Sequence, residues 1–280
     1  MINFNGNLSE EKNIISVDNR GYNYGDALFE TLKISHGKIL FWEDHYFRLM
    51  ASMRILRMEI PMNFTMEFLE AQVQDTIEAN QLSGKTARVK IIVHRHEGGL
   101  YLPETNDVGF IITVKELEHD FFIINESAYE VDLFKDHYIS PSLISTLKTN
   151  NKVLHVVGSI FAHENHFQNC LLLNTDKKVV EALNGNIFLV KGNVIKTPPL
   201  IDGCLKGIMR TQLINVIKTL PDYKFEEASI SPFELQKADE LWVTNVIVGI
   251  QPITKYRKKE FSKDIAKLVL QKMNVKARLS

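Results

Sequence analysis

Cysteine is scarce in this chain, which holds only Cys170 and Cys204 among its 280 residues. So few cysteines exclude a disulfide framework and are typical of a reducing cytosol. No apolar run approaches the ~20 residues that a membrane-spanning helix needs, and the first residues lack the basic and apolar regions of a signal peptide. We therefore expect a cytoplasmic protein that has no membrane partner.

An excess of one charge is also absent, because 33 Lys and Arg residues against 34 Asp and Glu residues leave a net charge of -1 at pH 7. This balance gives no attraction to polyanions, so we expect no nucleic-acid partner. With 45% hydrophobic and 24% charged residues, the composition is that of an ordinary globular protein. A chain of this length can bury a large core, in one large domain or two modest ones.

The first part of the chain mixes strand and helix patterns. Alternating apolar residues predict strands at 28–34, 86–95 and 108–115, and apolar residues at helical spacing predict helices at 43–57 and 65–80. The pattern gives way to charged residues near 117–122, which we interpret as a linker. Residues 1–116 are therefore predicted to form an N-terminal α/β domain.

The remainder, residues 123–280, is predicted to form a larger C-terminal α/β domain. Its helical patterns lie at 151–169, 207–220, 232–237 and 261–273. Its short strands, separated by turn residues, lie at 128–133, 170–174, 179–182, 186–191, 194–197, 223–228 and 240–244. The fold class is therefore α/β (mixed α+β), in two domains.

Lys148 follows an apolar stretch at 143–147 and directly precedes the predicted helix at 151–169. Most lysines are solvated surface charges, and that interpretation stays open here. Apolar surroundings lower the pKa of a lysine, which favours the neutral amine that attacks an aldehyde to form an imine. Lys148 is therefore a candidate nucleophile.

Glu181 interrupts the apolar run 179–183. A carboxylate in such a place needs a cationic partner. A structural pair with Arg or Lys is one possibility, and a protonated pyridine nitrogen is the other. The second partner would make a pyridine ring a strong electron sink.

Gly203 and Gly207 flank the start of the predicted helix at 207–220. The backbone N–H groups of Ile208 and Met209 would face outward at that start, which makes an anion site by geometry. An ordinary strand–helix turn also uses glycine, so this alternative stays open. An imine-forming lysine, a carboxylate for a ring nitrogen and a phosphate-binding helix start are together the parts that a pyridoxal-phosphate site needs.

Two further cations are candidates for binding anionic groups. Arg48, in the helix 43–57, could bring a fixed charge to a phosphate, although most such arginines lie at the surface. Arg88, Lys90 and His94 share one face of the strand 86–95, which suggests a polar cavity for a substrate carboxylate. The alternative is a solvent-facing edge strand.

Taken together, these segments resemble the fold-type IV pyridoxal-phosphate enzymes, the class-IV aminotransferase family. The resemblance covers nearly the whole chain in family order, through the segments 18–31, 45–49, 145–151, 179–188, 207–210 and 239–253. The family includes branched-chain aminotransferases, D-amino-acid aminotransferases and aminodeoxychorismate lyases. It implies a smaller N-terminal α/β domain, a larger C-terminal α/β pseudo-barrel domain, bound pyridoxal 5'-phosphate and a homodimer whose partner helps to complete the pocket.

The resemblance also implies a role for each matching residue. Lys148 would carry the internal aldimine and move the Cα proton, and Glu181 would bind the pyridine nitrogen. The other cofactor contacts would come from a packing residue and phosphate-binding residues: Leu205, Ile208, Met209, Arg48, Asn245 and Val246. Tyr24, Phe29 and Lys90 would line the pocket for a small-molecule amine substrate. No metal ligand is implied.

Three positions resemble the lyase branch of the family. Transaminases usually have Thr at the positions of Met209 and Val246, and tend to have Tyr at the position of Val153. We therefore expect a 4-amino-4-deoxychorismate lyase of folate biosynthesis, which would release pyruvate and 4-aminobenzoate. The alternatives are a transaminase of the same family, acting on branched-chain L-amino acids or D-amino acids, and a non-catalytic relative that only binds cofactor or a protein partner.

Overall fold

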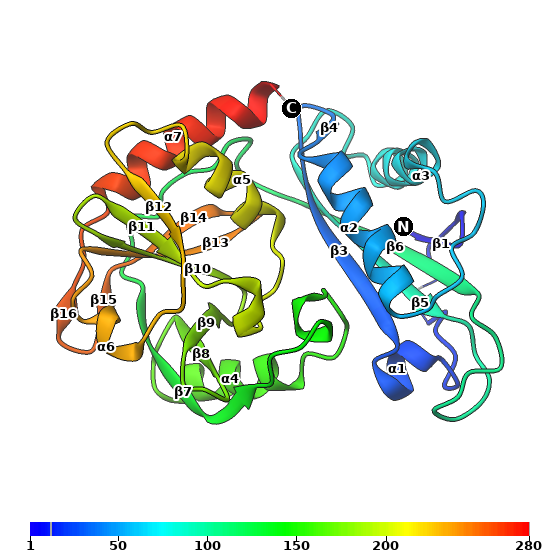
Figure 1. Cartoon of the computed structure of the whole chain (residues 1–280). Helices are drawn as coiled ribbons and strands as arrows, with labels where there is room; N and C mark the ends of the chain where they lie inside the picture. Colours follow the sequence, from blue (N-terminus) through cyan, green and yellow to red (C-terminus); the bar gives the residue numbers. More distant parts are fainter. Residues whose placement is uncertain (12, 280) are drawn as a thin grey trace. The chain divides into compact units, whose positions relative to one another are not determined.

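The computed structural model describes residues 1–11 and 13–279. By its internal contacts the chain divides into two compact units (Figure 1). The first unit comprises Met1–Phe121 together with Lys148–Asn151, and the second comprises Phe122–Leu147 and the chain from Lys152 onward. The domain limits expected from the sequence, with a linker at 117–122, stay a prediction.

The first unit is built on one six-stranded sheet with the order β2-β1-β6-β5-β3-β4. Its strands are β1 (Ile2–Phe4), β2 (Asn7–Ser9), β3 (Ala27–Ser35), β4 (Lys38–Ile39), β5 (Ala87–Arg95) and β6 (Val108–Glu116). Its helices are α1 (Arg20–Tyr24), α2 (Trp42–Ile55) and α3 (Met66–Ala79). Helix α2 packs on β3 and α3 packs on β6 (Figure 1).

Strand β5 lies between β3 and β6, so the alternative of an edge strand is wrong. Val89 and Ile91 are fully buried, whereas Arg88 is exposed and Lys90 is half-buried on the other face. The period-2 alternation of a strand explains this separation. One face of β5 therefore contributes Val89 and Ile91 to the core, and the other carries Arg88 and Lys90.

The second unit is built on one larger sheet whose main path is β12-β11-β10-β9-β8-β7-β15-β16, with β13 joining β10 to β14. Its longer strands are β7 (Glu130–Ile139), β8 (Asn169–Asn174), β10 (Gly185–Lys191), β13 (Glu240–Asn245) and β14 (Gly249–Ile253). Its shorter strands are β9 (Val179–Ala182), β11 (Val194–Thr197), β12 (Lys224–Glu227), β15 (Lys255–Tyr256) and β16 (Lys259–Glu260). Its α-helices are α4 (Val153–Glu164), α5 (Ile208–Ile217), α6 (Pro232–Leu235) and α7 (Asp264–Leu279), and two 3₁₀ turns lie at Ile144–Thr146 and Leu200–Asp202.

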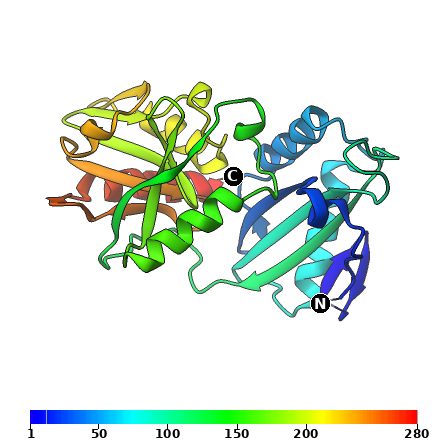
Figure 2. The same ribbon diagram turned by 90° about the horizontal axis from the view of Figure 1, so that it is seen from below.

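Two of the three parallel strand pairs in this second unit have a helix between their strands in the chain. Strands β7 and β8 run parallel with α4 between them in the chain, and β11 and β12 run parallel with α5 between them. A helix is the usual crossover between parallel strands. Figure 2 gives a second view of α4 beside the strands that it joins. His155 in the first turn of α4 approaches β9, and Leu205 in the turn before α5 approaches β10.

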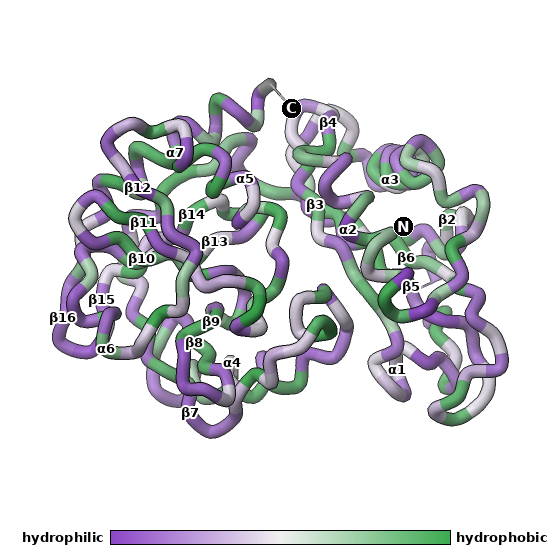
Figure 3. Tube along the Cα trace, viewed as in Figure 1, coloured by the Kyte–Doolittle hydropathy of each residue, from purple (hydrophilic) through white to green (hydrophobic). Residues whose placement is uncertain are grey.

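The buried carboxylate of Glu240 fixes the start of the last helix. Its two oxygens accept the backbone N–H groups of Ile265 at 2.8 Å and Ala266 at 2.9 Å, as well as the indole N–H of Trp242 at 2.8 Å. A carboxylate at a helix N-terminus satisfies otherwise unpaired donors and complements the helix dipole. Helix α7 carries both hydrophilic and hydrophobic residues (Figure 3) and packs on β13 and β14.

The structure confirms the mixed α/β class with two sheets. Most predicted elements are present within a few residues, but the prediction of a helix at 261–273 is shifted, because α7 begins at Asp264 and continues to Leu279. Helix α1 and strands β2, β14, β15 and β16 were not predicted from the sequence. Among the described residues, none of the helices combines the length and the apolar character that a bilayer crossing requires.

Candidate functional site

Lys148 is held against β3 in the first unit. The backbone N–H of Phe29 donates to the carbonyl of Lys148 at 2.9 Å, and Leu28 and Thr149 form an antiparallel bridge. The Lys148 Nζ lies 4.3 Å from the centre of the Phe29 ring. Backbone hydrogen bonds to β3 therefore fix the main chain at Lys148, and the face of an aromatic ring lies beside its amine.

Lys90 shares the same aromatic ring. Its Nζ lies 4.7 Å from the centre of the Phe29 ring, and β5 carries it beside β3. Burial lowers the pKa of Lys90, and the nearby charge of Arg88 lowers it further. The structure thus brings together Lys148, Phe29 and Lys90, three of the residues singled out in the sequence.

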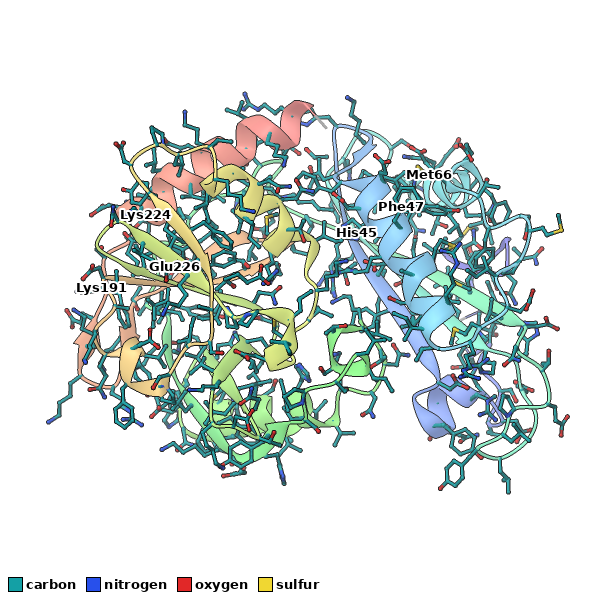
Figure 4. All side chains as sticks on the ribbon, in the orientation of Figure 1. His45, Phe47, Met66, Lys191, Lys224 and Glu226 are labelled. Carbon is teal, nitrogen blue, oxygen red and sulfur yellow. The ribbon has the colours of Figure 1, made fainter. Side chains whose placement is uncertain are left out.

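Arg48 lies on α2, where its guanidinium binds the buried carboxylate of Glu30. Arg48 Nε donates to Glu30 Oε1 at 2.7 Å, and a terminal nitrogen donates to Oε2 at 2.5 Å. The Nδ1 of His45, labelled on α2 in Figure 4, lies 2.7 Å from the same Oε2. The role of Arg48 as a phosphate ligand stays a prediction, and Glu30 is a partner that the sequence did not reveal.

The pKa of Glu30 reflects a balance of opposing effects. Burial raises the pKa of this carboxyl, but the charge of Arg48 and the hydrogen bond to His45 outweigh burial and lower it to about 2. Glu30 is therefore a carboxylate at neutral pH. Burial also lowers the pKa of His45, against the opposing effect of Glu30.

Tyr24 is the last residue of α1 and is 40% exposed. Its ring lies 5.8 Å from that of Tyr101 and 4.9 Å from the guanidinium of Arg20. Arg20 in turn binds Asp26 at 3.0 Å. The predicted pocket-lining role of Tyr24 therefore falls on a side chain that is open to solvent at one end of β3.

Glu181 lies on β9 in the second unit and is 6% exposed. Its Oε2 accepts the backbone N–H of Leu205 at 2.8 Å, and its Oε1 lies 3.2 Å from the Nε2 of His155. A carboxylate has about four lone-pair sites, so two donors leave room for another. Glu181 thus keeps capacity for a cationic N–H.

The residues after Leu205 lead into α5, which begins at Ile208 with Gly207 as its N-cap. No described side chain caps this helix start, and Ile208 and Met209 are buried. The first N–H groups of a helix have no partner within it, and the dipole there favours an anion. The Nδ2 of Asn186 donates to the carbonyl of Leu205 at 2.8 Å and fixes the turn.

Gly207 allows this turn to pack on Asn186. A Cβ at position 207 would lie 2.1 Å from Asn186 Oδ1, which is closer than real Cβ contacts. We expect Gly207→Ala to lower the free energy of unfolding by about 1–3 kcal/mol, because overpacking forces shifts of buried groups. Urea denaturation of this variant beside Gly192→Ala is the measurement, since Gly192 has open space around it. Gly192 has a left-handed φ of +57°, so Gly192→Ala is itself strained. The predicted clash between position 207 and Asn186 is therefore contradicted only if Gly207→Ala is as stable as the wild type.

Asn245 and Val246 follow the end of β13. The Oδ1 of Asn245 accepts the backbone N–H groups of Ile247 at 3.0 Å and Val248 at 3.1 Å. The neighbouring Thr244 lies opposite Asn186 in the β10–β13 pair, and Asn186 lies opposite Glu181 in the β9–β10 pair. Cross-strand register therefore connects Asn245 and Val246 with Glu181 and the α5 turn in one part of the second unit.

Most of the chain, including these residues, matches a known protein family. A family model described as amino-transferase class IV matches residues 27–256. The chain belongs to this family.

Curated class-IV relatives have different activities. The chain is 24% identical over 242 residues to an aminodeoxychorismate lyase of Vibrio harveyi, with 86% of each chain covered. It is 28% identical over 253 residues to a putative branched-chain-amino-acid aminotransferase of Methanocaldococcus jannaschii, covering 90% of this chain and 86% of the relative. The family is shared by both relatives, and their activities differ.

A solved class-IV structure agrees with the fold. The branched-chain amino acid aminotransferase of Thermobaculum terrenum in its PLP form superposes with a TM-score of 0.84 at 19% identity, covering 99% of this chain and 93% of the other. The fold of this chain is therefore that of class-IV aminotransferase structures. At this identity the likeness concerns the fold alone.

The residues present fit pyridoxal phosphate. Glu181 has spare acceptor capacity for a ring N–H, α5 has an uncapped start, and Lys148 carries its amine beside an aromatic face. Lys148 belongs to the first unit, and Glu181 and α5 belong to the second. Among residues 1–11 and 13–279, no group of three or more acidic, His or Cys side chains gathers in the way that a metal ion requires.

Two functional candidates could not be recognised from the sequence. His155 lies 26 residues before Glu181, and only the packing of α4 on β7 and β8 brings the two side chains together. Glu30 was part of a matched segment, but its pairing with Arg48 depends on how α2 packs on β3. Both contacts are long-range and follow from tertiary structure alone.

Proposed function

We propose that this class-IV enzyme is a pyridoxal-phosphate-dependent 4-amino-4-deoxychorismate lyase, which releases pyruvate and 4-aminobenzoate for folate biosynthesis. The observation that carries the proposal is the apolar character of Met209, Val246 and Val153. Transaminases of the family usually place hydroxyl side chains there. We also propose a cytoplasmic homodimer in which the partner helps to complete the pocket.

We propose a contact with the cofactor for each of the following residues. Glu181 would accept the ring N–H, Leu205 would pack on the ring, and the N–H groups of Ile208 and Met209 would bind the phosphate. Arg48 would add a charge, and Asn245 and Val246 would add the last contacts on the phosphate side. The spare acceptor capacity of Glu181 and the uncapped start of α5 support these assignments.

Pyridoxal phosphate, when bound, supplies an aldehyde for a substrate amine and an electron sink for the carbon next to it. Lys148 would provide the proton transfers. Its neutral Nζ would take the proton from the carbon that bears the amine, and its ammonium would then return a proton as pyruvate leaves. The half-buried amine of Lys90 beside Phe29 would bind a carboxylate of the substrate, and Tyr24 would line the same pocket.

A second candidate function is a transaminase that acts on branched-chain L-amino acids or D-amino acids with a 2-oxo acid acceptor. The relative at 28% identity, a putative branched-chain aminotransferase, favours this alternative. Both functions need Lys148 and Glu181. They differ in whether an acceptor is required.

The deciding experiment supplies aminodeoxychorismate to the purified holoenzyme without any 2-oxo acid and measures 4-aminobenzoate and pyruvate. Equal release of both products supports the lyase. If neither product forms while the protein carries bound cofactor, the lyase is wrong, and a panel of L- and D-amino acids then tests the transaminase. Formation of the pyridoxamine form with an amino acid alone would support that second function.

A further inference from the structure

The carboxylate of Glu181 has a neighbour for which neither the family model nor the sequence assigns a role. His155 is the third residue of α4, and its Nε2 lies 3.2 Å from Glu181 Oε1. The side chains are 20% exposed for His155 and 8% exposed for Glu181. The contact is thus largely shielded from water, where a hydrogen bond to a charged group is stronger than at the surface.

The hydrogen-bonding pattern identifies which nitrogen of His155 carries a hydrogen. A carboxylate only accepts, so Nε2 must donate to Glu181. The Nδ1 is buried and has no hydrogen-bond partner among the described residues. The geometry therefore places a hydrogen on Nε2, between the ring and the carboxylate.

Glu181 is surrounded by a defined set of groups. His155 and Lys152 approach from α4, and the backbone N–H of Leu205 and the thiol of Cys204 approach from the turn before α5. Burial lowers the pKa of Lys152, and the charge of Glu181 opposes that shift. Of the side chains in this set, His155 is the one that bonds to the carboxylate directly. Leu205 holds one oxygen and His155 holds the other.

We propose that His155 is a positioning residue for Glu181. By donating to Oε1 it fixes the plane of the carboxylate, so that the remaining acceptor sites are aimed at a ring N–H before the cofactor arrives. The inference rests on the proposed function, since that ring is the pyridine of pyridoxal phosphate. Its consequence is a more tightly bound cofactor whose ring nitrogen stays protonated to a higher pH.

The test compares purified wild-type holoenzyme with His155→Gln, His155→Met and His163→Met. Gln keeps an N–H donor near the place of Nε2, and Met fills a similar volume without a donor. His163 is exposed and lies two turns further along α4, so its replacement controls for the loss of a histidine from that helix. The readouts are the dissociation constant of pyridoxal phosphate, measured by absorbance, and the pH at which the visible absorption of the bound cofactor changes.

We expect His155→Met to weaken cofactor binding about tenfold, because one hydrogen bond to a charged group is lost. We expect its absorption transition to move to lower pH. His155→Gln is expected to remain within about twofold of the wild type, and His163→Met to match it. Should His155→Met not fold, His155→Asn replaces it, because the shorter amide does not reach Glu181.

Two results would overturn this inference while leaving the proposed function intact. One is wild-type affinity and an unchanged absorption transition in His155→Met. The other is an equal loss in His155→Gln and His155→Met, which would assign His155 to packing alone. Wild-type protein that binds no pyridoxal phosphate would instead overturn the proposed function, and this inference with it.

Discussion

Replacing Lys148 with alanine is expected to abolish catalysis and the visible absorption of the bound cofactor. Loss of a general acid–base group alone lowers a rate by about 10²–10⁴-fold, and the covalent link to the cofactor that we propose for Lys148 would be lost as well. The fold should persist, because the bonds that fix this segment come from the backbone of Lys148, Thr149 and Asn150. Product formation and an absorption spectrum of the same sample are the measurements.

A matched control for Lys148→Ala is Lys115→Ala, which removes an exposed lysine from β6. We expect wild-type activity, spectrum and thermal unfolding for this control. Lys148→Ala should share the wild-type unfolding temperature to within a few degrees, which separates chemistry from folding. Full activity in Lys148→Ala would show that this lysine has no part in the reaction.

Replacing Glu30 with alanine is expected to have the largest effect on stability, a loss of about 3–5 kcal/mol. The carboxylate is 2% exposed and binds both Arg48 and His45, whose side chains are 10% and 0% exposed. Its removal takes from the buried guanidinium of Arg48 the carboxylate to which it donates two hydrogen bonds. Urea denaturation measures the loss, with Glu70→Ala, an exposed residue of α3, as the control.

Hydrogen exchange should locate this loss. Because Glu30 lies on β3 and its partners on α2, amides of these two elements should exchange faster in Glu30→Ala. Amides of β13, in the second unit, should keep their protection. An equal loss of amide protection in both units would contradict a local effect of Glu30. An unchanged exchange rate in β3 would show that Glu30 does not stabilise the first unit.

The same carboxyl predicts how stability depends on pH. Its pKa falls from 4.5 to about 2 on folding, so its contribution is fully present above pH about 4.5 and is lost as the pH falls toward about 2. A pKa difference of one corresponds to 1.36 kcal/mol, so Glu30 contributes about 3 kcal/mol to the free energy of unfolding. Other carboxyls titrate in the same range, so the informative quantity is the stability difference between wild type and Glu30→Gln. That difference should shrink between pH 4.5 and pH 2.

Features that depend on neighbouring residues could be predicted from the sequence, and features that depend on distant residues could not. The strand 86–95 was recognisable because alternation is a property of neighbouring residues, and Val89 and Ile91 are buried as that pattern requires. The short strands β15 and β16 have only two residues each and carry no pattern to detect. The start of α7 depends on Glu240, which lies 24 residues earlier and gives no signal in the helix itself.

The candidate site shows the same division. Lys148, Glu181 and the α5 turn were recognisable from residue type and neighbours. Their partners were not, since the bond from Glu181 to His155 and the ion pair of Arg48 with Glu30 join segments that are distant in sequence. The amine of Lys148 beside Phe29 likewise depends on the pairing of Thr149 with Leu28.

The four-residue segment Lys148–Asn151 limits which chimeric proteins can be made from this chain and its relatives. These residues belong to the first unit, although the chain on both sides of them belongs to the second. A chimera joined anywhere between residues 122 and 147 would take β3 from one parent and the segment that binds β3 from the other. The carbonyl of Lys148 and the N–H of Asn150, which bond to Phe29 and Ala27, would then face a foreign strand. Functional chimeras of such enzymes should therefore take Lys148–Asn151 and Met1–Phe121 from the same parent. Residues Phe122–Leu147 of the second unit separate these two segments in the sequence.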